Sequence, residues 1–266
     1  MDLPPTALPP TALPRNSFKA ALAEFRQQIG IWCSIPGSGH AEALAGCGFD
    51  WMLIDTEHTA VDHTTVQAML QGAAPYPTHA AVRPGWNDPV EIKRLLDIGA
   101  QTILVPYVQT AEEAARAVAA VRYPPMGIRG VAGITRASRY GLVADYATRA
   151  HEETCLLVQI ETAAALDRIE EIAAVEGVDG IFIGPADLAA TMGHPGNPGH
   201  PEVRAAVLDA VRRIRAAGRP AGILSLDPGF LHEAVAAGTV FTAVDVDSAI
   251  LLRGARELAR AWKGGA

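Results

Sequence analysis

Residues 155–187 read CLLVQIETAAALDRIEEIAAVEGVDGIFIGPAD, and this stretch contains the pattern that decides the fold. The runs Cys155–Glu161 and Gly180–Gly184 are mostly apolar at consecutive positions rather than at alternate ones. That pattern is typical of strands buried on both faces, as in a parallel sheet. The stretch between them, Ala163–Val175, has the pattern of a helix. Strand, helix and strand in this order form one unit of an α/β fold.

The same alternation continues on both sides of this unit. Further helices are predicted at Pro89–Gly99, Ala111–Val121 and Glu202–Ala217. Eight strands with intervening helices in 266 residues predict a (β/α)8, or TIM, barrel. An open doubly wound sheet is the alternative, because periodicity does not prove closure. The other six predicted strands are Ile31–Ile35, Trp51–Asp55, Ala80–Arg83, Thr102–Val108, Ala221–Leu224 and Phe241–Val246.

The predicted domain organisation is a tail followed by one domain. Residues 1–16 contain a Pro-rich repeat, TALPP followed by TALP, and are predicted to be a disordered tail. Residues 17–266 are predicted to form a single barrel domain. The Pro- and Gly-rich stretches inside 108–155 and at 193–203 are interpreted as functional loops rather than linkers.

Composition excludes several classes of protein. The net charge is −7 and no dense Lys/Arg run occurs, so no nucleic-acid partner is expected. The sequence has no apolar run long enough for a transmembrane helix, so no membrane partner is expected. Cys33, Cys47 and Cys155 show no CxxC spacing, which favours reduced thiols and a cytoplasmic location.

Two carboxylates follow neighbouring predicted strands. Glu161 ends one strand, and Asp187 comes just after the next. Chemistry in a TIM barrel sits at the C-terminal ends of the strands, where neighbouring strands lie about 4.8 Å apart. Two carboxylates there repel each other unless a positive group lies between them, and a divalent cation meets that need. The alternative is that each carboxylate pairs with an arginine or caps a helix.

Three further polar residues mark strand ends. His58 follows a buried strand, and Asp55 lies three residues before it. A carboxylate that accepts from one imidazole nitrogen fixes the tautomer and leaves the other nitrogen as a base, although a lone histidine is more often structural. Arg83 ends the next strand, where a guanidinium can bind an oxyanion or form a structural salt bridge with Glu57.

With these residues in place, the sequence resembles the HpcH/HpaI aldolase family from about Ile29 to Trp262. The resemblance implies a TIM barrel of the phosphoenolpyruvate/pyruvate-binding type. It also implies a homohexamer, a trimer of dimers that exchange their last helix. The motifs that carry it are GFDWMLIDTEH, AVRPGWNDPVEIKRLLDIGAQTILVPYVQ, RYPPMGIRG, LLVQIET and VDGIFIGPADLAATMGHPGNPGHPEV.

The resemblance also assigns roles to the residues. Glu161 and Asp187 match ligands of Mg²⁺, Mn²⁺ or Co²⁺, and Arg83 matches the residue that grips the pyruvate keto oxygen. The other matches are His58 as acid/base supported by Asp55, Asp97 as a carboxylate that reaches a neighbouring subunit's site, Gln159 as a polar residue near the metal, and the amides of Ala186 and Asp187 as the group that holds the pyruvate carboxylate.

The implied function is that of a metal-dependent class II aldolase. Such an enzyme reversibly cleaves 4-hydroxy-2-oxo acids to pyruvate, or a close 2-oxo acid, and an aldehyde. Neither Lys19 nor Lys93 lies at a strand end, which disfavours a Schiff-base mechanism. Two alternatives remain: decarboxylation of an oxaloacetate-type acid at the same site, and a non-catalytic barrel that binds a keto acid. Thr56 stands where close relatives often have Gly, which bears on the aldehyde accepted.

Overall fold

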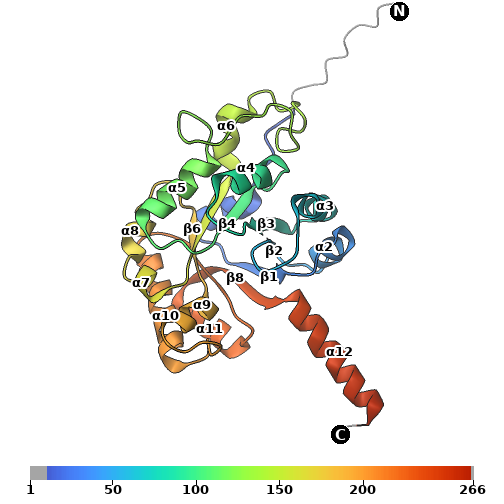
Figure 1. Cartoon of the computed structure of the whole chain (residues 1–266), viewed down its shortest axis with the longest axis vertical. Coiled ribbons are helices and arrows are strands. Elements are labelled where there is room, and N and C mark those ends of the chain that lie inside the picture. Colours follow the sequence, from blue (N-terminus) through green and yellow to red (C-terminus); the bar gives the residue numbers. More distant parts are fainter. Residues whose placement is uncertain (1–10, 265–266) are drawn as a thin grey trace, which may run out of the picture.

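Eight parallel strands close into a barrel, in which each strand pairs with the next along the chain and the eighth pairs with the first. The structure is a computed structural model and describes residues 11–264 (Figure 1). The predicted (β/α)8 barrel is confirmed, and the open doubly wound sheet is wrong because β8 and β1 are hydrogen-bonded. The strands are β1 (Gln28–Cys33), β2 (Trp51–Asp55), β3 (His79–Arg83), β4 (Thr102–Val105), β5 (Cys155–Ile160), β6 (Gly180–Ile183), β7 (Ala221–Leu224) and β8 (Thr239–Val246).

Helices surround the barrel and connect its strands. Many begin at a residue whose side chain accepts from the first-turn amides, as Thr110 does from Glu113 N–H at 3.2 Å. The helices are α1 (Ser17–Ala23), α2 (Ser38–Ala45), α3 (His63–Ala73), α4 (Pro89–Asp97), α5 (Ala111–Val121), α6 (Tyr146–Glu153), α7 (Ala163–Leu166), α8 (Ile169–Ala173), α9 (Pro185–Thr191), α10 (Pro201–Ala216), α11 (Pro228–Ala237) and α12 (Asp247–Lys263).

Some predicted boundaries differ from those observed. β1 covers Gln28–Cys33 rather than Ile31–Ile35, and β4 ends at Val105 rather than Val108. β4 ends there because Pro106 has no N–H to continue the ladder. The predicted helix Ala163–Val175 is two short helices, α7 and α8, and the predicted long loop before β5 contains α6.

Large side chains fill the interior of the barrel. Trp51, Phe182 and Phe241 are buried there, and Phe241 lies 6.0 Å from Phe182 between ring centroids. A glycine on the next strand makes room for this packing, since a Cβ atom at Gly222 would collide with the Phe241 ring. A second apolar layer packs between the outer face of the strands and the helices. The interior is thus a packed core rather than a channel.

The N-terminal end of the barrel is closed by α1. Phe18 is buried and stacks on His79, with 5.4 Å between ring centroids. Asn16 caps α1 and donates to Thr102 Oγ1 at 3.1 Å. Residues 1–10 of the predicted tail lie outside the described residues, while Pro14 accepts a hydrogen bond from Gln101 at 2.7 Å. The packing of α1 therefore covers the barrel interior at this end.

The last helix, α12, extends away from the barrel (Figure 1). Its only buried residue is Asp247, at its start. Asp247 accepts hydrogen bonds from the amides of Ser34 and Ile35, which fixes where the helix leaves the barrel. Within residues 11–264, no helix has both the length and the apolar character needed to cross a membrane.

Candidate active site

The predicted site residues lie at the C-terminal ends of neighbouring strands. Asp55 is the last residue of β2 and Arg83 the last of β3, while Glu161 follows β5 directly. Asp187 lies in the first turn of α9, just after β6. This is the end of a TIM barrel where catalytic residues are found. Closure of the barrel brings them to one mouth, although Asp55 and Asp187 are more than a hundred residues apart in sequence.

Arg83 and Asp55 form a buried bidentate ion pair. Arg83 Nε donates to Asp55 Oδ1 at 2.9 Å, and Nη2 donates to Oδ2 at 2.8 Å. The two residues are direct neighbours in the register of β2 and β3. Trp32 supports the pair, since its indole N–H lies 3.4 Å from Asp55 Oδ2 and the guanidinium carbon lies 4.9 Å from its ring. Burial alone would raise the pKa of Asp55, but the hydrogen bonds and charge of Arg83 outweigh it and lower that pKa.

The expected support of His58 by Asp55 is wrong in this structure. Both Asp55 oxygens are taken by Arg83, and the imidazole of His58 is 66% exposed, with its Nε2 3.8 Å from Glu57 Oε2. The reason is topological. Asp55 is within the sheet, where the neighbouring strand supplies its partner, whereas His58 is three residues beyond the strand end. His58 is at the rim of the mouth and keeps its predicted place there.

Arg83 also contacts Glu57, as the structural alternative for this residue predicts. Its Nη1 lies 2.8 Å from Glu57 Oε2. Each terminal nitrogen of a guanidinium carries two N–H groups. Within the described residues each is engaged by one carboxylate, so both keep an N–H that can meet an oxyanion. The salt bridges therefore orient Arg83 without exhausting it.

Glu161 is the most buried carboxylate of the mouth, with 2% of the residue exposed. Its Oε1 accepts from the amide of Tyr107 at 2.8 Å, and its Oε2 accepts from Gln159 Nε2 at 2.5 Å. Gly184 leaves room for it, since a Cβ at that position would lie 2.5 Å from Oε2. These contacts hold the carboxylate in one orientation and confirm that Gln159 lies beside it.

The amide of Tyr107 reaches Glu161 because the backbone turns there. Pro106 ends β4, and Tyr107 has φ 55°, in the left-handed region that non-glycine residues rarely adopt. The Tyr107 ring stacks on Trp86, with 5.6 Å between centroids. Such backbone strain persists where the surroundings enforce it and is common at functional sites. Here it places a main-chain donor on a buried carboxylate.

Burial and neighbouring carboxylates raise the pKa of two glutamates at this mouth, Glu161 and Glu57. Burial raises the pKa of Glu161 to about 7, and the charges of Glu57 and Asp187 act in the same direction against two hydrogen bonds. Burial also raises the pKa of Glu57; Arg83 opposes this, while Asp55 and Asp187 add to it. The site is therefore short of positive charge, although it contains Arg83.

The donor set fits a divalent cation. Glu57 Oε2 and Gln159 Oε1 are buried and accept no hydrogen bond of good geometry from the described residues. Carboxylate and amide oxygens are the ligands of hard cations such as Mg²⁺ and Mn²⁺. A cation here would relieve the repulsion between Glu161 and Asp187. The predicted role of Glu161 and Asp187 as metal ligands stays a prediction, and the repulsion between the two carboxylates is compatible with it.

Two other predicted residues occupy the start of α9. Ala186 and Asp187 are exposed, and both lie in the first turn of that helix. Backbone N–H groups in a first helical turn have no partner inside the helix. The predicted role of these amides in holding a carboxylate stays a prediction, and their placement beside Glu161 is compatible with it.

Asp97 is not part of this chain's mouth. It is the last residue of α4, which returns from the end of β3 to the start of β4 and so ends on the opposite side of the barrel. Its Oδ1 accepts from Arg129 Nη2 at 2.7 Å. The predicted reach of Asp97 into a neighbouring subunit's site stays a prediction.

Three contributors to the site were not predicted from the sequence. The sequence places Glu57 after the second strand and indicates it as a salt-bridge partner of Arg83, but it does not predict its contribution to the negative charge around Glu161. Trp32 comes from β1, and no polar strand end indicated it. The amide of Tyr107 is a main-chain group, so no residue type in the sequence indicates its role. Only the adjacent Pro106 indicates that the strand ends there.

A closed barrel with carboxylates and a guanidinium at the C-terminal ends of its strands defines a TIM-barrel enzyme. The family model described as HpcH/HpaI aldolase/citrate lyase matches residues 28–253, and the chain belongs to this family. The predicted family is confirmed, as is the predicted enzyme class of carbon–carbon lyases.

Named relatives are similar over nearly the whole chain. A "Pyruvate aldolase" of Rhizobium etli is 59% identical over 244 residues, 92% of this chain and 96% of the relative. A "Hydroxypyruvate/pyruvate aldolase" of Sagittula stellata is 56% identical over 262 residues, 98% and 100% of the two chains. The crystal structure of an HpcH/HpaI aldolase/citrate lyase family protein from Burkholderia cenocepacia has a TM-score of 0.90 at 37% identity and covers 94% of this chain and 100% of its own.

The raised pKa of Glu161 predicts how the stability of the metal-free protein depends on pH. Between the ordinary value of 4.5 and about 7, the folded carboxyl holds a proton that the unfolded chain releases. The free energy of unfolding therefore falls as pH rises through this window, by at most about 3 kcal/mol. Urea denaturation of EDTA-treated protein at several pH values measures this. Glu161→Gln should flatten the profile, and the exposed control Glu176→Gln should not. Equal slopes in all three proteins would contradict the assignment.

Proposed function

We propose that this chain is a metal-dependent class II aldolase that reversibly cleaves 4-hydroxy-2-oxo acids to an aldehyde and pyruvate or a close 2-oxo acid. One observation carries the proposal. Glu161 is a buried carboxylate of raised pKa, beside Glu57 and Asp187 and at the same mouth as Arg83. A 2-oxo acid is an anion with an adjacent keto oxygen, so its recognition requires concentrated positive charge. A divalent cation and a guanidinium supply that charge.

Glu161 and Asp187 would hold the cation, and Gln159 orients Glu161. When bound, the cation polarises the 2-oxo group and makes the C3 hydrogens more acidic. The amide of Tyr107 and Gln159 Nε2 keep the Glu161 carboxylate directed by hydrogen bonds of 2.8 and 2.5 Å. Mg²⁺, Mn²⁺ and Co²⁺ all accept such oxygen ligands, so assays decide among them.

Arg83 stabilises the negative charge that develops on the keto oxygen when the carbon–carbon bond breaks. The Asp55 pair and the Trp32 ring fix the direction of its guanidinium before the substrate arrives. Preorganised donors of this kind stabilise a transition state because they need no reorganisation during the reaction. The unengaged N–H groups on Nη1 and Nη2 are the ones available for the oxygen.

His58 moves the proton. In the cleavage direction it takes the proton of the 4-hydroxyl group, and in the reverse direction it returns a proton to the new alkoxide. The side chain is 66% exposed at the rim, which suits a group that meets the aldehyde half of the substrate. Thr56, two residues before His58, donates to the carbonyl of Arg83 at 2.6 Å.

The relatives support pyruvate-type donors. Both named relatives carry pyruvate in their names, and that of Sagittula stellata also carries hydroxypyruvate. We extend the proposed donors to both acids. Hydroxypyruvate differs by one hydroxyl at C3, the carbon from which the enolate forms.

The experiment that tests this function measures pyruvate release from a panel of 4-hydroxy-2-oxo acids after EDTA treatment and dialysis. We expect no release without metal and restored release with Mn²⁺, Mg²⁺ or Co²⁺. Oxaloacetate is included in the panel. Full turnover by the metal-depleted enzyme would contradict the class II assignment. Turnover of oxaloacetate alone would show that the enzyme is a decarboxylase rather than an aldolase.

Replacing Arg83 should separate enolate formation from metal binding. Arg83→Gln removes the guanidinium, and we expect exchange of the pyruvate C3 protons with deuterium to fall by about 100-fold or more. Proton NMR of pyruvate in heavy water measures the exchange, and calorimetry with Mn²⁺ measures metal binding, which should persist. Because the single variant leaves Asp55 buried without its partner, the double variant Arg83→Gln/Asp55→Asn is the folding control. If either variant exchanges the pyruvate C3 protons at the wild-type rate, Arg83 does not stabilise the enolate.

We also propose that α12 packs on a second copy of the chain. Its apolar side chains stay exposed in the single chain, with Leu251 59%, Leu258 63% and Trp262 87% exposed. They are spaced seven and four residues apart, so they share one face of the helix. An apolar stripe of this kind is typical of a subunit contact. The homo-oligomer implied by the family resemblance gives this face its partner.

Loss of that stripe should reduce the oligomer. We expect Leu258→Glu to lower the mass measured by light scattering after gel filtration, since it places a charge in the apolar contact. Arg260→Glu lies on a different face of α12 and is the matched control. A wild-type monomer, or an unchanged mass for Leu258→Glu, would argue against α12 as the contact.

A further inference from the structure

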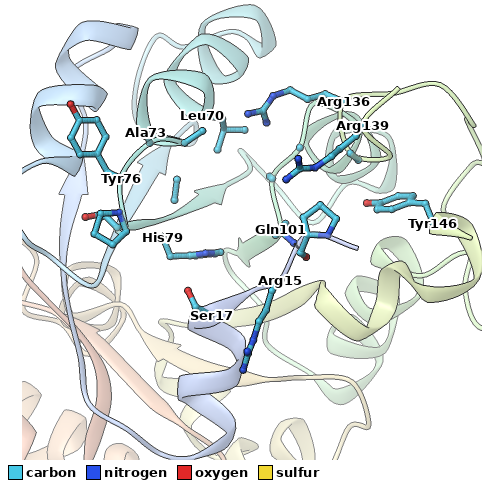
Figure 2. Close-up of a pocket in the computed structure, with 18 of the residues that line it drawn as sticks. Arg15, Ser17, Leu70, Ala73, Tyr76, His79, Gln101, Arg136, Arg139 and Tyr146 are labelled. Carbon is cyan, nitrogen blue, oxygen red and sulfur yellow. Dashed lines mark hydrogen bonds between the residues drawn. The ribbon is translucent and has the colours of Figure 1, made fainter. Parts of the chain in front are cut away.

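One cavity lies at the end of the barrel opposite the carboxylates. It has a volume of about 660 Å³ and is lined by residues at the starts of β3 and β4, by α1, and by the loop between α5 and α6 (Figure 2). The C-terminal ends of those strands carry the candidate active site, so the cavity is separated from it by the packed barrel interior. Nothing in the proposed aldolase reaction uses it.

The lining of this cavity is positively charged. Arg136 and Arg139 come from the loop, and Figure 2 shows both guanidinium groups directed into the cavity. None of the described lining residues is Asp or Glu. The chain as a whole has a net charge of −7, so this concentration of positive charge is a local exception. A concave surface of one charge attracts ligands of the opposite charge.

Neither arginine has a carboxylate partner among the described residues. Arg136 Nη1 donates to the carbonyl of Ile98 at 3.0 Å, which positions the side chain but does not neutralise it. Burial lowers the pKa of Arg136, and the charge of Arg139 acts in the same direction. Two guanidinium groups thus lie near each other, and no carboxylate among the described residues pairs with either one. An anion between them would relieve that repulsion.

The loop that carries both arginines is held in a strained conformation. Arg139 has φ 50° and Tyr140 φ 56°, and Gly141 follows at φ 88°. Buried Ser138 holds the turn, since its Oγ bonds the carbonyl of Gly133 at 2.8 Å and accepts from the amide of Gly141 at 3.1 Å. Consecutive left-handed residues that are not glycine are costly, and such strain clusters at functional sites.

The rest of the lining supplies hydroxyl groups and apolar surface. Ser17 and Tyr146 point their hydroxyl groups toward the cavity in Figure 2, and Leu70 and Leu142 provide apolar wall. His79 adds no charge at neutral pH, because burial lowers its pKa to about 4 and its Nε2 pairs with Thr102 Oγ1 at 2.7 Å. This suits an acidic group attached to an apolar body.

We propose that this cavity binds a small organic anion, with its carboxylate or phosphate group held between Arg136 and Arg139. The hydroxyl groups of Ser17 and Tyr146 complete the polar contacts, and the apolar wall takes the body of the molecule. Because the starts of β3 and β4 lead directly to Arg83 and the Tyr107 turn, the site is placed to act as an effector site.

The test uses the full-length protein after EDTA treatment, so that phosphate does not bind a metal at the mouth. Inorganic phosphate, pyrophosphate and succinate are titrated separately by calorimetry, with phosphorus NMR line widths as a second readout. We expect at least one oxyanion to bind the wild type. We expect Arg136→Gln/Arg139→Gln to weaken that binding by about tenfold or more, since two charge-assisted hydrogen bonds are lost.

Controls keep the result interpretable. Arg139→Gln alone removes a side chain that makes no hydrogen bond or ion pair within the described residues, so it should weaken binding without affecting the fold. Arg212→Gln, an exposed arginine of α10, and Arg83→Gln at the mouth should both bind as the wild type does. Binding of phosphate or succinate that is lost in the double variant supports the site and distinguishes the two chemistries. No binding by any probe, or equal binding by the double variant, overturns it. If Arg83→Gln loses oxyanion binding instead, the anion binds at the mouth, and the proposed site is overturned.

Discussion

The burial of Glu161 is the constraint on which the rest of the site depends. A carboxylate with 2% exposure has lost most of its hydration and must be stabilised by the protein or take up a proton. The chain supplies two hydrogen bonds, from Gln159 and the Tyr107 amide, yet the pKa still rises to about 7. A site built to be neutral would have placed an arginine beside it. Arg83 is instead committed to Asp55 and Glu57.

This separation of charges gives the mouth two different halves. One half joins Arg83 and Asp55 across the register of β2 and β3, and its pairing makes the guanidinium rigid. In the other half, no Lys or Arg of residues 11–264 pairs with Glu161 or Asp187. A substrate that bears both an acidic group and a polarisable carbonyl is complementary to such an arrangement once a cation is added. Because Arg83 is held rigidly in the first half, an exchangeable cation can supply the positive charge that the second half lacks.

Much of the fold was readable because parallel strands are buried on both faces and therefore appear as continuous apolar runs. The polar residues that follow those runs were predicted to meet, and Glu161, Arg83 and Asp55 do. The partner of Asp55 was predicted wrongly, since spacing along the chain favoured His58 whereas the register between strands supplies Arg83. Sequence spacing carries no information on register. The role of the Tyr107 amide could not be predicted from the sequence either, because its direction depends on a φ of 55° rather than on any side chain.

The two ends of the barrel show how one packed interior can separate two environments. At the N-terminal end, Phe18 closes the core and the arginines of the α5–α6 loop lie outside it. At the C-terminal end, several strands finish in or next to charged residues, and the guanidinium of Arg83 lies over the ring of Trp32. Strands are stiff, and β3 connects both environments directly, with His79 at one end and Arg83 at the other. The five residues of β3 therefore form a direct covalent link between the wall of the proposed anion cavity and the ion pair that orients the guanidinium.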